Sequence, residues 1–189
     1  MSLYYVKNKG AGYSPTPNII EPNFTGDGEY FNCGDISSTG IGINSMSISL
    51  WFKPREALNN YPIFLQAGGT INNGTRGFYL RYMKDSNTLR TIINDGTNSI
   101  SSTDVPFDHD EWVHYVIVIN RINNHLLAYV NGINKAQDDI SHIGNISPVN
   151  TLTINHSGNW RYNGLIDDVR IYNRLLSENE IKWMYNMSR

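Results

Sequence analysis

Short runs in which apolar and polar residues alternate recur along most of this chain. In residues 45–52 (SMSISLWF), apolar residues occupy every second position and serines lie between them. This period of two predicts a half-buried antiparallel strand, which Pro54 helps to end. Residues 112–120 give the clearest strand pattern, with valines alternating against isoleucines. Further runs of this kind are residues 62–67, 77–83, 89–93, 97–102, 125–130, 133–136, 151–155 and 165–172.

Two hairpin turns and one helix are marked by their residue types. Asn94–Asp95–Gly96 and Asn131–Gly132 each lie between two of these runs, and both tolerate the positive φ that tight hairpins need. Near the C-terminus, Ser177 and Glu180 form a capping box that predicts the start of a helix. The apolar residues on one face of that helix are Ile181, Met184 and Tyr185. About a dozen strands, frequent turns and one short C-terminal helix predict an all-β sandwich of two antiparallel sheets.

The first 22 residues differ from the rest of the chain. They contain Pro15, Pro17 and Pro22, which cannot donate hydrogen bonds to a sheet. We expect an extended N-terminal arm over residues 1–22, with one short strand near Tyr4, followed by a single domain over residues 23–189. Two alternatives remain open for the arm. It either packs on its own domain as a strand and loop, or docks on a partner, namely a second copy of the chain or a viral capsid.

Composition narrows the class of protein. The chain has 189 residues, of which 40% are hydrophobic and 17% charged, with a formal net charge of -2. This balance is too apolar for a disordered chain and does not favour nucleic-acid binding by net charge. No apolar run reaches the roughly 20 residues that a membrane-spanning helix needs. A single cysteine, Cys33, excludes an internal disulfide, and its surroundings predict an inert, buried thiol.

Four ordered motifs resemble one family. They are residues 24–31 (FTGDGEYF), 47–54 (SISLWFKP), the pair 112–116 and 128–132 (WVHYV and AYVNG), and 162–177 (YNGLIDDVRIYNRLLS). Together they are similar to the opening strand, second strand, hairpin and closing segment of laminin-G-like, concanavalin A-like jelly-roll domains. The resemblance covers residues 24–185 and implies a jelly-roll sandwich. It leaves function open, because this fold hosts lectins, adhesion modules, accessory domains of glycosidases and virion proteins.

The same resemblance implies a structural Ca²⁺ site where the opening loop meets the closing strand. It points to Asp27 and Asp168, with Asp167 as the next ligand, and calcium prefers several such oxygen donors. Two family aspartates are replaced here, by Thr25 and Glu29. The alternative is that these carboxylates accept hydrogen bonds from backbone amides at a β-bulge.

A bulge also follows from the spacing of apolar residues in the closing strand. Two aspartates interrupt it, so strict alternation places Asp167 on the same face as Val169 and Ile171. One extra residue at Asp167–Asp168 allows Ile166 to share the inward face with Val169 and Ile171, and turns a carboxylate to the rim.

Two loops carry the residue types that bind sugars, which are recognised by aromatic faces together with amide or charged groups. Trp160 lies in a polar loop, residues 156–161, where Asn159 and Arg161 supply hydrogen-bonding groups. Tyr61 follows two asparagines in a second loop. The alternative for Trp160 is packing against the edge of the sandwich or a neighbouring subunit.

The sequence gives no support to catalysis. It lacks the E-x-D-x-x-E triplet expected of a retaining glycosidase of this fold, and its five histidines lack metal-binding spacing. The acidic segment 108–111 is expected to be a solvated loop. No glycine-rich phosphate loop and no basic patch with interleaved aromatic residues is present. Five N-glycosylation sequons, among them Asn155, carry no weight in a chain this rich in asparagine.

We therefore expect a non-catalytic recognition or adhesion module that binds carbohydrate or a protein surface. The alternative is a virion structural protein, such as a phage capsid decoration or tail-associated protein. The start of the chain lacks the basic and apolar regions of a secretory signal peptide. The expected location is extracellular or on a virion surface.

Overall fold

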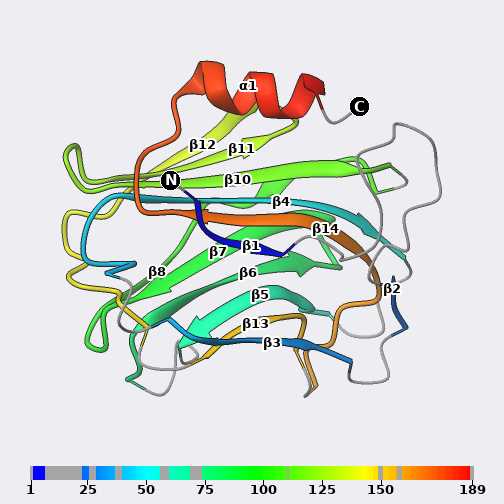
Figure 1. Ribbon diagram of the computed structural model, residues 1–189, viewed down its shortest axis with the longest axis horizontal. Helices are drawn as coiled ribbons and strands as arrows, with labels where there is room; N and C mark the ends of the chain where they lie inside the picture. The colour runs from blue at the N-terminus through cyan, green and yellow to red at the C-terminus, as the bar shows by residue number, and fades with distance from the viewer. Residues whose placement is uncertain are drawn as a thin grey trace.

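The computed structural model contains two packed antiparallel sheets and one helix (Figure 1). It describes residues 2–6, 23–25, 29–36, 40–55, 60–68, 74–109, 111–148, 151–156 and 159–187. The predicted all-β sandwich with a short C-terminal helix is confirmed.

The first sheet has six strands in a continuous path, and a seventh pairs beside it. Every pairing is antiparallel. In spatial order, the strands are β1 (Ser2–Val6), β14 (Gly164–Tyr172), β4 (Met46–Pro54), β10 (Val113–Asn120), β11 (His125–Val130) and β12 (Ile133–Asp139). The seventh strand, β2 (Asn23–Phe24), pairs with β14.

The second sheet has the same number of strands and is also antiparallel. In spatial order, its strands are β3 (Phe31–Asp35), β13 (Thr151–Ile154), β5 (Ile63–Gly68), β6 (Gly77–Met83), β7 (Thr88–Asn94) and β8 (Ser99–Ser101). The short strand β9 (Val105–Pro106) pairs with β7.

The main core fills the space between the two sheets. Alternate residues of β10 and β6 face each other there, including Tyr115, Ile117 and Leu80, all fully buried. The Tyr115 hydroxyl would be costly to bury alone. It is paired with the Thr91 hydroxyl of the opposite sheet at 2.9 Å, which links the two sheets through their polar atoms as well as their apolar ones.

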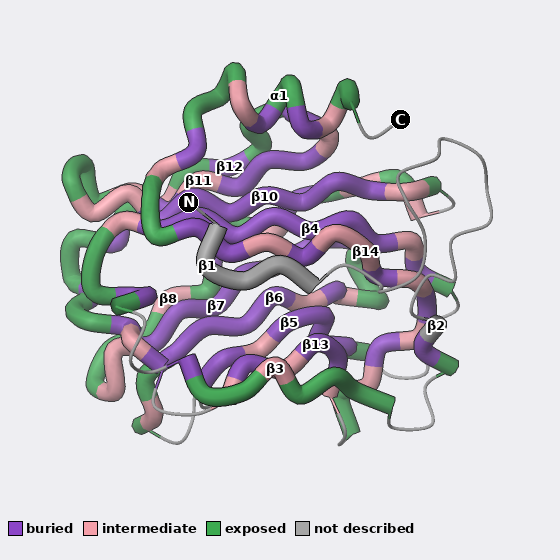
Figure 2. Tube along the Cα trace, viewed as in Figure 1, coloured by how far each residue is buried: buried purple, intermediate pink, exposed green. Residues whose placement is uncertain are grey.

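The expectation that residues 45–52 form a half-buried strand is wrong. Both faces of β4 are buried (Figure 2), and Ser47 and Ser49 are almost fully inaccessible. Buried hydroxyls need partners. Ser47 Oγ donates to the carbonyl of Arg174 and accepts a hydrogen bond from the amide of Leu176, each at 3.0 Å. The serines therefore lie beneath a second cover, and not in solvent.

That cover is α1 (Glu178–Met187) together with the residues leading into it (Figure 1). The predicted capping box is confirmed. The Ser177 amide donates to Glu180 Oε2 at 2.8 Å, and the Glu180 amide donates to Ser177 Oγ at 3.3 Å. Ile181 and Met184 are buried against the outer face of the first sheet, in a cluster separate from the main core.

Two rings of the first sheet stack with a ring of the helix, Tyr185. His114 of β10 lies 4.9 Å from the ring of Trp51 and 6.3 Å from that of Tyr185, centroid to centroid. Its Nε2 is 2.9 Å from the Ser49 hydroxyl, and its buried Nδ1 bonds to no described residue. Burial, with a smaller contribution from the charge of Arg170, lowers the pKa of His114 to about 4. His114 is thus neutral in the folded protein at neutral pH.

The β-bulge predicted in the closing strand is confirmed. The register of β14 against β4 shifts between Asp167 and Arg170, and Asp168 has a positive φ of 49°. As a result Ile166, Val169 and Ile171 all join the main core, although strict alternation forbids it.

Both predicted hairpin turns are confirmed. Asn131 and Gly132 have φ values of 52° and 77°, and join β11 to β12. Asp95 lies in the turn between β7 and β8, and its carboxylate accepts the amides of Thr97, Asn98 and Gly144. Burial raises the pKa of Asp95, but these hydrogen bonds outweigh burial and lower the pKa to about 2. One carboxylate therefore fixes this turn and ties it to the segment around Gly144.

The strand expected near Tyr4 is β1, which pairs with the outer edge of β14. The start of the N-terminal arm thus joins its own sandwich, the first of the two alternatives. Residues 7–22 lie outside the described residues, so docking of the arm on another molecule stays a prediction.

We predict that His114 makes stability fall as pH drops from about 6.5 to 4. In that range the unfolded chain takes up a proton on this imidazole and the folded protein does not, so acid favours unfolding. The expected loss of unfolding free energy is about 3 kcal/mol, from a shift of about 2.5 pH units at 1.36 kcal/mol each. Denaturant melts from pH 7 to 4 measure it. The slope should flatten in His114→Gln and persist in the control His142→Gln, a surface position; equal slopes in wild type and His114→Gln contradict the assignment.

We also predict that Ser47→Ala lowers the free energy of unfolding by about 1–3 kcal/mol. The substitution leaves the buried amide of Leu176 without its acceptor. Ser101→Ala, on an exposed face of β8, is the matched control and should stay within about 0.5 kcal/mol of wild type. Similar losses in the two variants would show that the Ser47 hydroxyl does not hold the helix cover.

Candidate functional site

The outer face of the second sheet differs from that of the first, because no described helix packs on it (Figure 1). The strand registers show which of its residues lie side by side. Tyr79 of β6 pairs with Ile92 of β7 and Gln66 of β5, and Gln66 pairs with Thr153 of β13. A second row places Arg81 opposite Arg90. This outer face presents aromatic, amide, hydroxyl and guanidinium groups together.

The two loops singled out in the sequence meet at one end of this face. The Ile63 amide donates to the Trp160 carbonyl at 2.9 Å, and Tyr61 lies two residues before Ile63. The side chains of Trp160 and Tyr61 remain 41% and 39% exposed. Asn159 is exposed and Arg161 partly exposed beside them. The structure therefore brings the four predicted sugar-binding residues to one place.

Trp160 is also supported from one side. Its indole meets the ring of His156 edge to face, with centroids 5.5 Å apart. The alternative that Trp160 packs on the sandwich is thus partly correct, since one edge is packed while two fifths of the side chain stays open.

Asn155 holds the loop that carries Trp160, and the sequence analysis missed its role. It has a positive φ of 65° and a fully buried side chain. Its Nδ2 donates to the Glu29 carbonyl at 2.7 Å, and its Oδ1 accepts the amides of His156 and Tyr162. This one amide closes the loop at both ends and ties it to the segment directly before β3. The asparagine preceding a polar turn is the local feature that indicates such a role.

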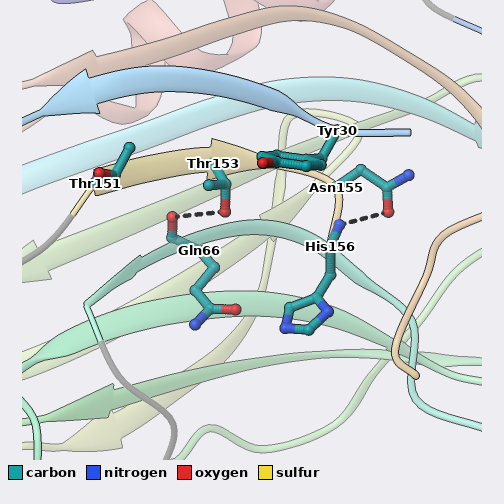
Figure 3. Close-up of a pocket in the computed structure, with 6 residues that line it drawn as sticks. All are labelled: Tyr30, Gln66, Thr151, Thr153, Asn155 and His156. Carbon is teal, nitrogen blue, oxygen red and sulfur yellow. Dashed lines mark hydrogen bonds between the residues drawn. The ribbon is translucent and has the colours of Figure 1, made fainter. Parts of the chain in front are cut away.

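A hollow of about 190 Å³ opens beside this loop (Figure 3). Gln66 contributes Nε2, which donates to the Gly68 carbonyl at 3.1 Å, and a buried Oε1 that bonds to no described residue. The exposed ring of Tyr30 forms one wall, and His156 connects the hollow to Trp160. The residues that line it are Tyr30, Gln66, Thr151, Thr153, Asn155 and His156.

Arg81 is a second residue of this face that the sequence did not identify as a candidate. Its guanidinium carbon lies 5.2 Å from the ring centroid of Tyr61 and 5.6 Å from that of Tyr79. Its neighbour Arg90 is held by the carboxylate of Asp104, in two hydrogen bonds of 2.5 and 2.7 Å. Alternation within residues 77–83 predicts that Tyr79 and Arg81 share the face opposite the core, but it does not show which residues lie across from them.

The described carboxylates predicted to bind calcium already have partners within the protein. Both oxygens of Asp168 contact the guanidinium of Arg170, at 2.7 and 2.8 Å. Asp167 Oδ1 accepts the amide of Asp168 at 2.7 Å, which is the alternative expected for a bulge. Asp27 lies outside the described residues, and those that are described contain no cluster of three or more side chains suited to a metal. The described donors alone do not fit a calcium ion, and calcium binding that includes Asp27 stays a prediction.

The structure also describes most of the acidic segment 108–111 and the single cysteine. Asp108 and Glu111 are exposed, as expected for a solvated loop, and Asp110 lies outside the described residues. Burial raises the pKa of the Cys33 thiol, which favours its unreactive, protonated form. Within the described part of the chain, no helix is long and apolar enough to cross a membrane.

Comparisons with solved structures identify similar folds. The CBM40 domain of the Ruminococcus gnavus IT-sialidase matches with a TM-score of 0.67 at 17% identity, covering 88% of this chain and 95% of that domain. The same domain bound to alpha2,3 sialyllactose matches with a TM-score of 0.65 at 18% identity, covering 82% and 92%. The binding domain of botulinum neurotoxin serotype G matches with a TM-score of 0.63 at 17% identity, covering 77% of this chain. The alignment spans only 36% of the toxin domain, and identities this low establish the fold alone.

Comparison at the level of sequence gives the family. No curated protein matches the chain. A family model, Laminin_G_3, described as the concanavalin A-like lectin/glucanases superfamily, matches residues 25–182. Those residues contain every strand of both sheets except β1 and β2, and they have the predicted jelly-roll sandwich. This chain therefore belongs to the Laminin_G_3 family of concanavalin A-like domains.

Proposed function

We propose that this protein is a non-catalytic carbohydrate-binding module whose binding site lies on the outer face of the second sheet. One observation carries the proposal. The loops of Trp160 and Tyr61, distant in sequence, are joined by the hydrogen bond from the Ile63 amide to the Trp160 carbonyl, and both aromatic residues remain about two fifths exposed. Trp160 contacts His156, which lines the polar hollow.

The chemistry of this face suits a sugar. The C–H faces of a pyranose ring pack on aromatic rings, and its hydroxyls pair with amide and hydroxyl groups. Trp160 and Tyr61 supply the rings, with Tyr30 at the far side of the hollow. Gln66 and Thr153 supply an amide and a hydroxyl between them. A ligand longer than one sugar residue can thus contact several of these groups at once.

The positions of the supporting residues favour recognition without catalysis. The loop of Trp160 is fixed by the buried Asn155 amide, so the site is formed before a ligand arrives. Asp104, a carboxylate on this face, is held by Arg90 in a bidentate pair and is not paired with a second acid among the described residues. A glycosidase needs two cooperating carboxylates.

The similar structures support the same class of ligand. One solved neighbour is the CBM40 domain bound to alpha2,3 sialyllactose, and two others are neurotoxin binding domains, one of them in complex with rat synaptotagmin II. Glycan and protein partners are therefore both found on this fold. A location outside the cell is consistent with such ligands and stays a prediction, as does the alternative of a virion surface protein.

Replacing Trp160 tests the proposal. Trp160→Ala should weaken glycan binding at least about tenfold, because a stacked ring is lost from the ligand. The melting temperature should change little, because the ring is largely outside the core. A glycan array identifies the ligand, and calorimetry on the best binder measures the change.

Trp183→Ala is the matched control. Trp183 is 61% exposed on α1, which lies on the other sheet, so its loss should leave binding unchanged. Equal binding by wild type and Trp160→Ala contradicts the proposed site. A large fall in the melting temperature of Trp160→Ala would show that the ring is a packing element and not a platform.

Calcium binding by Asp27, Asp167 and Asp168 is proposed separately and is tested by chelation. A cation bound only to the folded protein at 100 times its Kd stabilises it by about 2.7 kcal/mol, so excess chelator should lower the melting temperature by about 5–10 °C. Asp168→Asn also breaks the contact with Arg170, so the informative quantity is the further fall caused by chelator. That fall should be present in wild type and absent in the variant, and identical melts of wild type with and without chelator exclude the site.

A further inference from the structure

Two arginines lie directly opposite each other on the outer face of the second sheet. Arg81 of β6 and Arg90 of β7 are a cross-strand pair. Like charges in this position repel and destabilise a sheet. Arg90 is neutralised by a bidentate carboxylate, Asp104, at 2.5 and 2.7 Å. Arg81 has no such counterion among the described residues.

Arg81 instead lies against the rings of two tyrosines. Its guanidinium carbon is 5.2 Å from the centroid of Tyr61 and 5.6 Å from that of Tyr79. These contacts orient the guanidinium and attract its charge, but ring faces do not accept its planar hydrogen bonds. No described residue accepts a hydrogen bond from this guanidinium, and its Nε is fully buried.

Within the described part of the chain, the charge of Arg81 is thus held in place without a carboxylate that neutralises it. Burial, and to a smaller extent Arg90, lowers the pKa of Arg81, whereas the tyrosines and Asp104 raise it. A partly buried cation in this state is stabilised when an anion binds to it. Arginine has a planar fork of donors that matches a carboxylate or a sulfate.

Tyr61 connects this cation to the proposed sugar site. One side of its ring contacts Arg81, and its loop is bonded to Trp160 through Ile63. An acidic group at Arg81 and a sugar ring at Trp160 therefore lie on either side of a single residue.

We propose that the ligand of this site is an anionic glycan and that Arg81 binds its carboxylate or sulfate group. The proposal rests on the proposed function, since it assigns the ligand class of the same site. Arg81 is a binding residue here, positioned by Tyr61 and Tyr79, and the ligand supplies the counterion that no described residue provides.

Matched glycans test the proposal. The probes are one oligosaccharide in three forms that share a backbone: neutral, with a uronic acid in place of its terminal hexose, and with an O-sulfate on that hexose. Wild type should bind at least one acidic form at least tenfold more tightly than the neutral form. Raising NaCl from 50 to 500 mM should weaken binding of the acidic form and leave the neutral form nearly unchanged. The acidic form that binds more tightly distinguishes a carboxylate ligand from a sulfate ligand.

Two variants separate charge from geometry. Arg81→Gln should reduce binding of the acidic glycan to the level of the neutral one. Arg81→Lys keeps the charge but loses the planar fork, so an intermediate affinity is expected. Lys182→Gln on α1 removes one positive charge from the opposite side of the sandwich and should change nothing. Melting temperatures of all three establish that they are folded, and Arg81→Lys carries the test if Arg81→Gln does not fold.

The outcomes distinguish this inference from the proposed function. Equal affinity for neutral and acidic forms, with binding still dependent on Trp160, overturns the role of Arg81 and leaves the carbohydrate-binding site in place. An acidic preference that survives in Arg81→Gln also overturns it. Absence of binding to every glycan, neutral or acidic, overturns the proposed function and this inference together.

Discussion

The central strands of the first sheet bury both of their faces, and they do so because the C-terminal segment closes over them. Ser47 fixes this closure by bonding to the backbone at Arg174 and Leu176, and the capping box then starts α1 at a defined point. Apolar side chains on both faces of β10 are therefore buried away from water. The second sheet receives no helix within the described residues, so its outer face keeps polar and aromatic side chains that a covered sheet does not tolerate.

This asymmetry explains how one short domain combines rigidity with an available surface. Some strand residues on that outer face are held by fixed partners, as Arg90 is by the carboxylate of Asp104 and Gln66 by the carbonyl of Gly68. The loop that adds Trp160 is fixed by Asn155, and Tyr61 is brought to it by the adjacent strand. One end of this sheet thereby gathers two aromatic rings and a cation, which the proposed ligand contacts together.

Features determined by neighbouring residues were predictable from the sequence. The turn at Asn131–Gly132, the capping box at Ser177 and the bulge at Asp167–Asp168 each depend on a few consecutive residues, and all three are present. Features that depend on distant partners were not predictable. The serines of β4 look solvent-facing until residues more than 100 positions later cover them, and Arg81 is unremarkable until Tyr61 and Asp104 are placed around it. The four sugar-binding candidates were identified as two loops, but their meeting required the pairing of strands.

The buried amide of Asn155 also affects how this protein can be produced. Its sequence context, Asn155-His156-Ser157, is an acceptor for N-linked glycosylation, and the glycan is attached to the same nitrogen that donates to the carbonyls of Glu29 and Tyr162. A eukaryotic secretory cell modifies chains as they enter the lumen, and a glycan on that nitrogen cannot be accommodated where the side chain is fully enclosed. In such a host, folding and glycosylation compete for the same atom, so the folded molecules that leave the cell are those that escaped modification at this position.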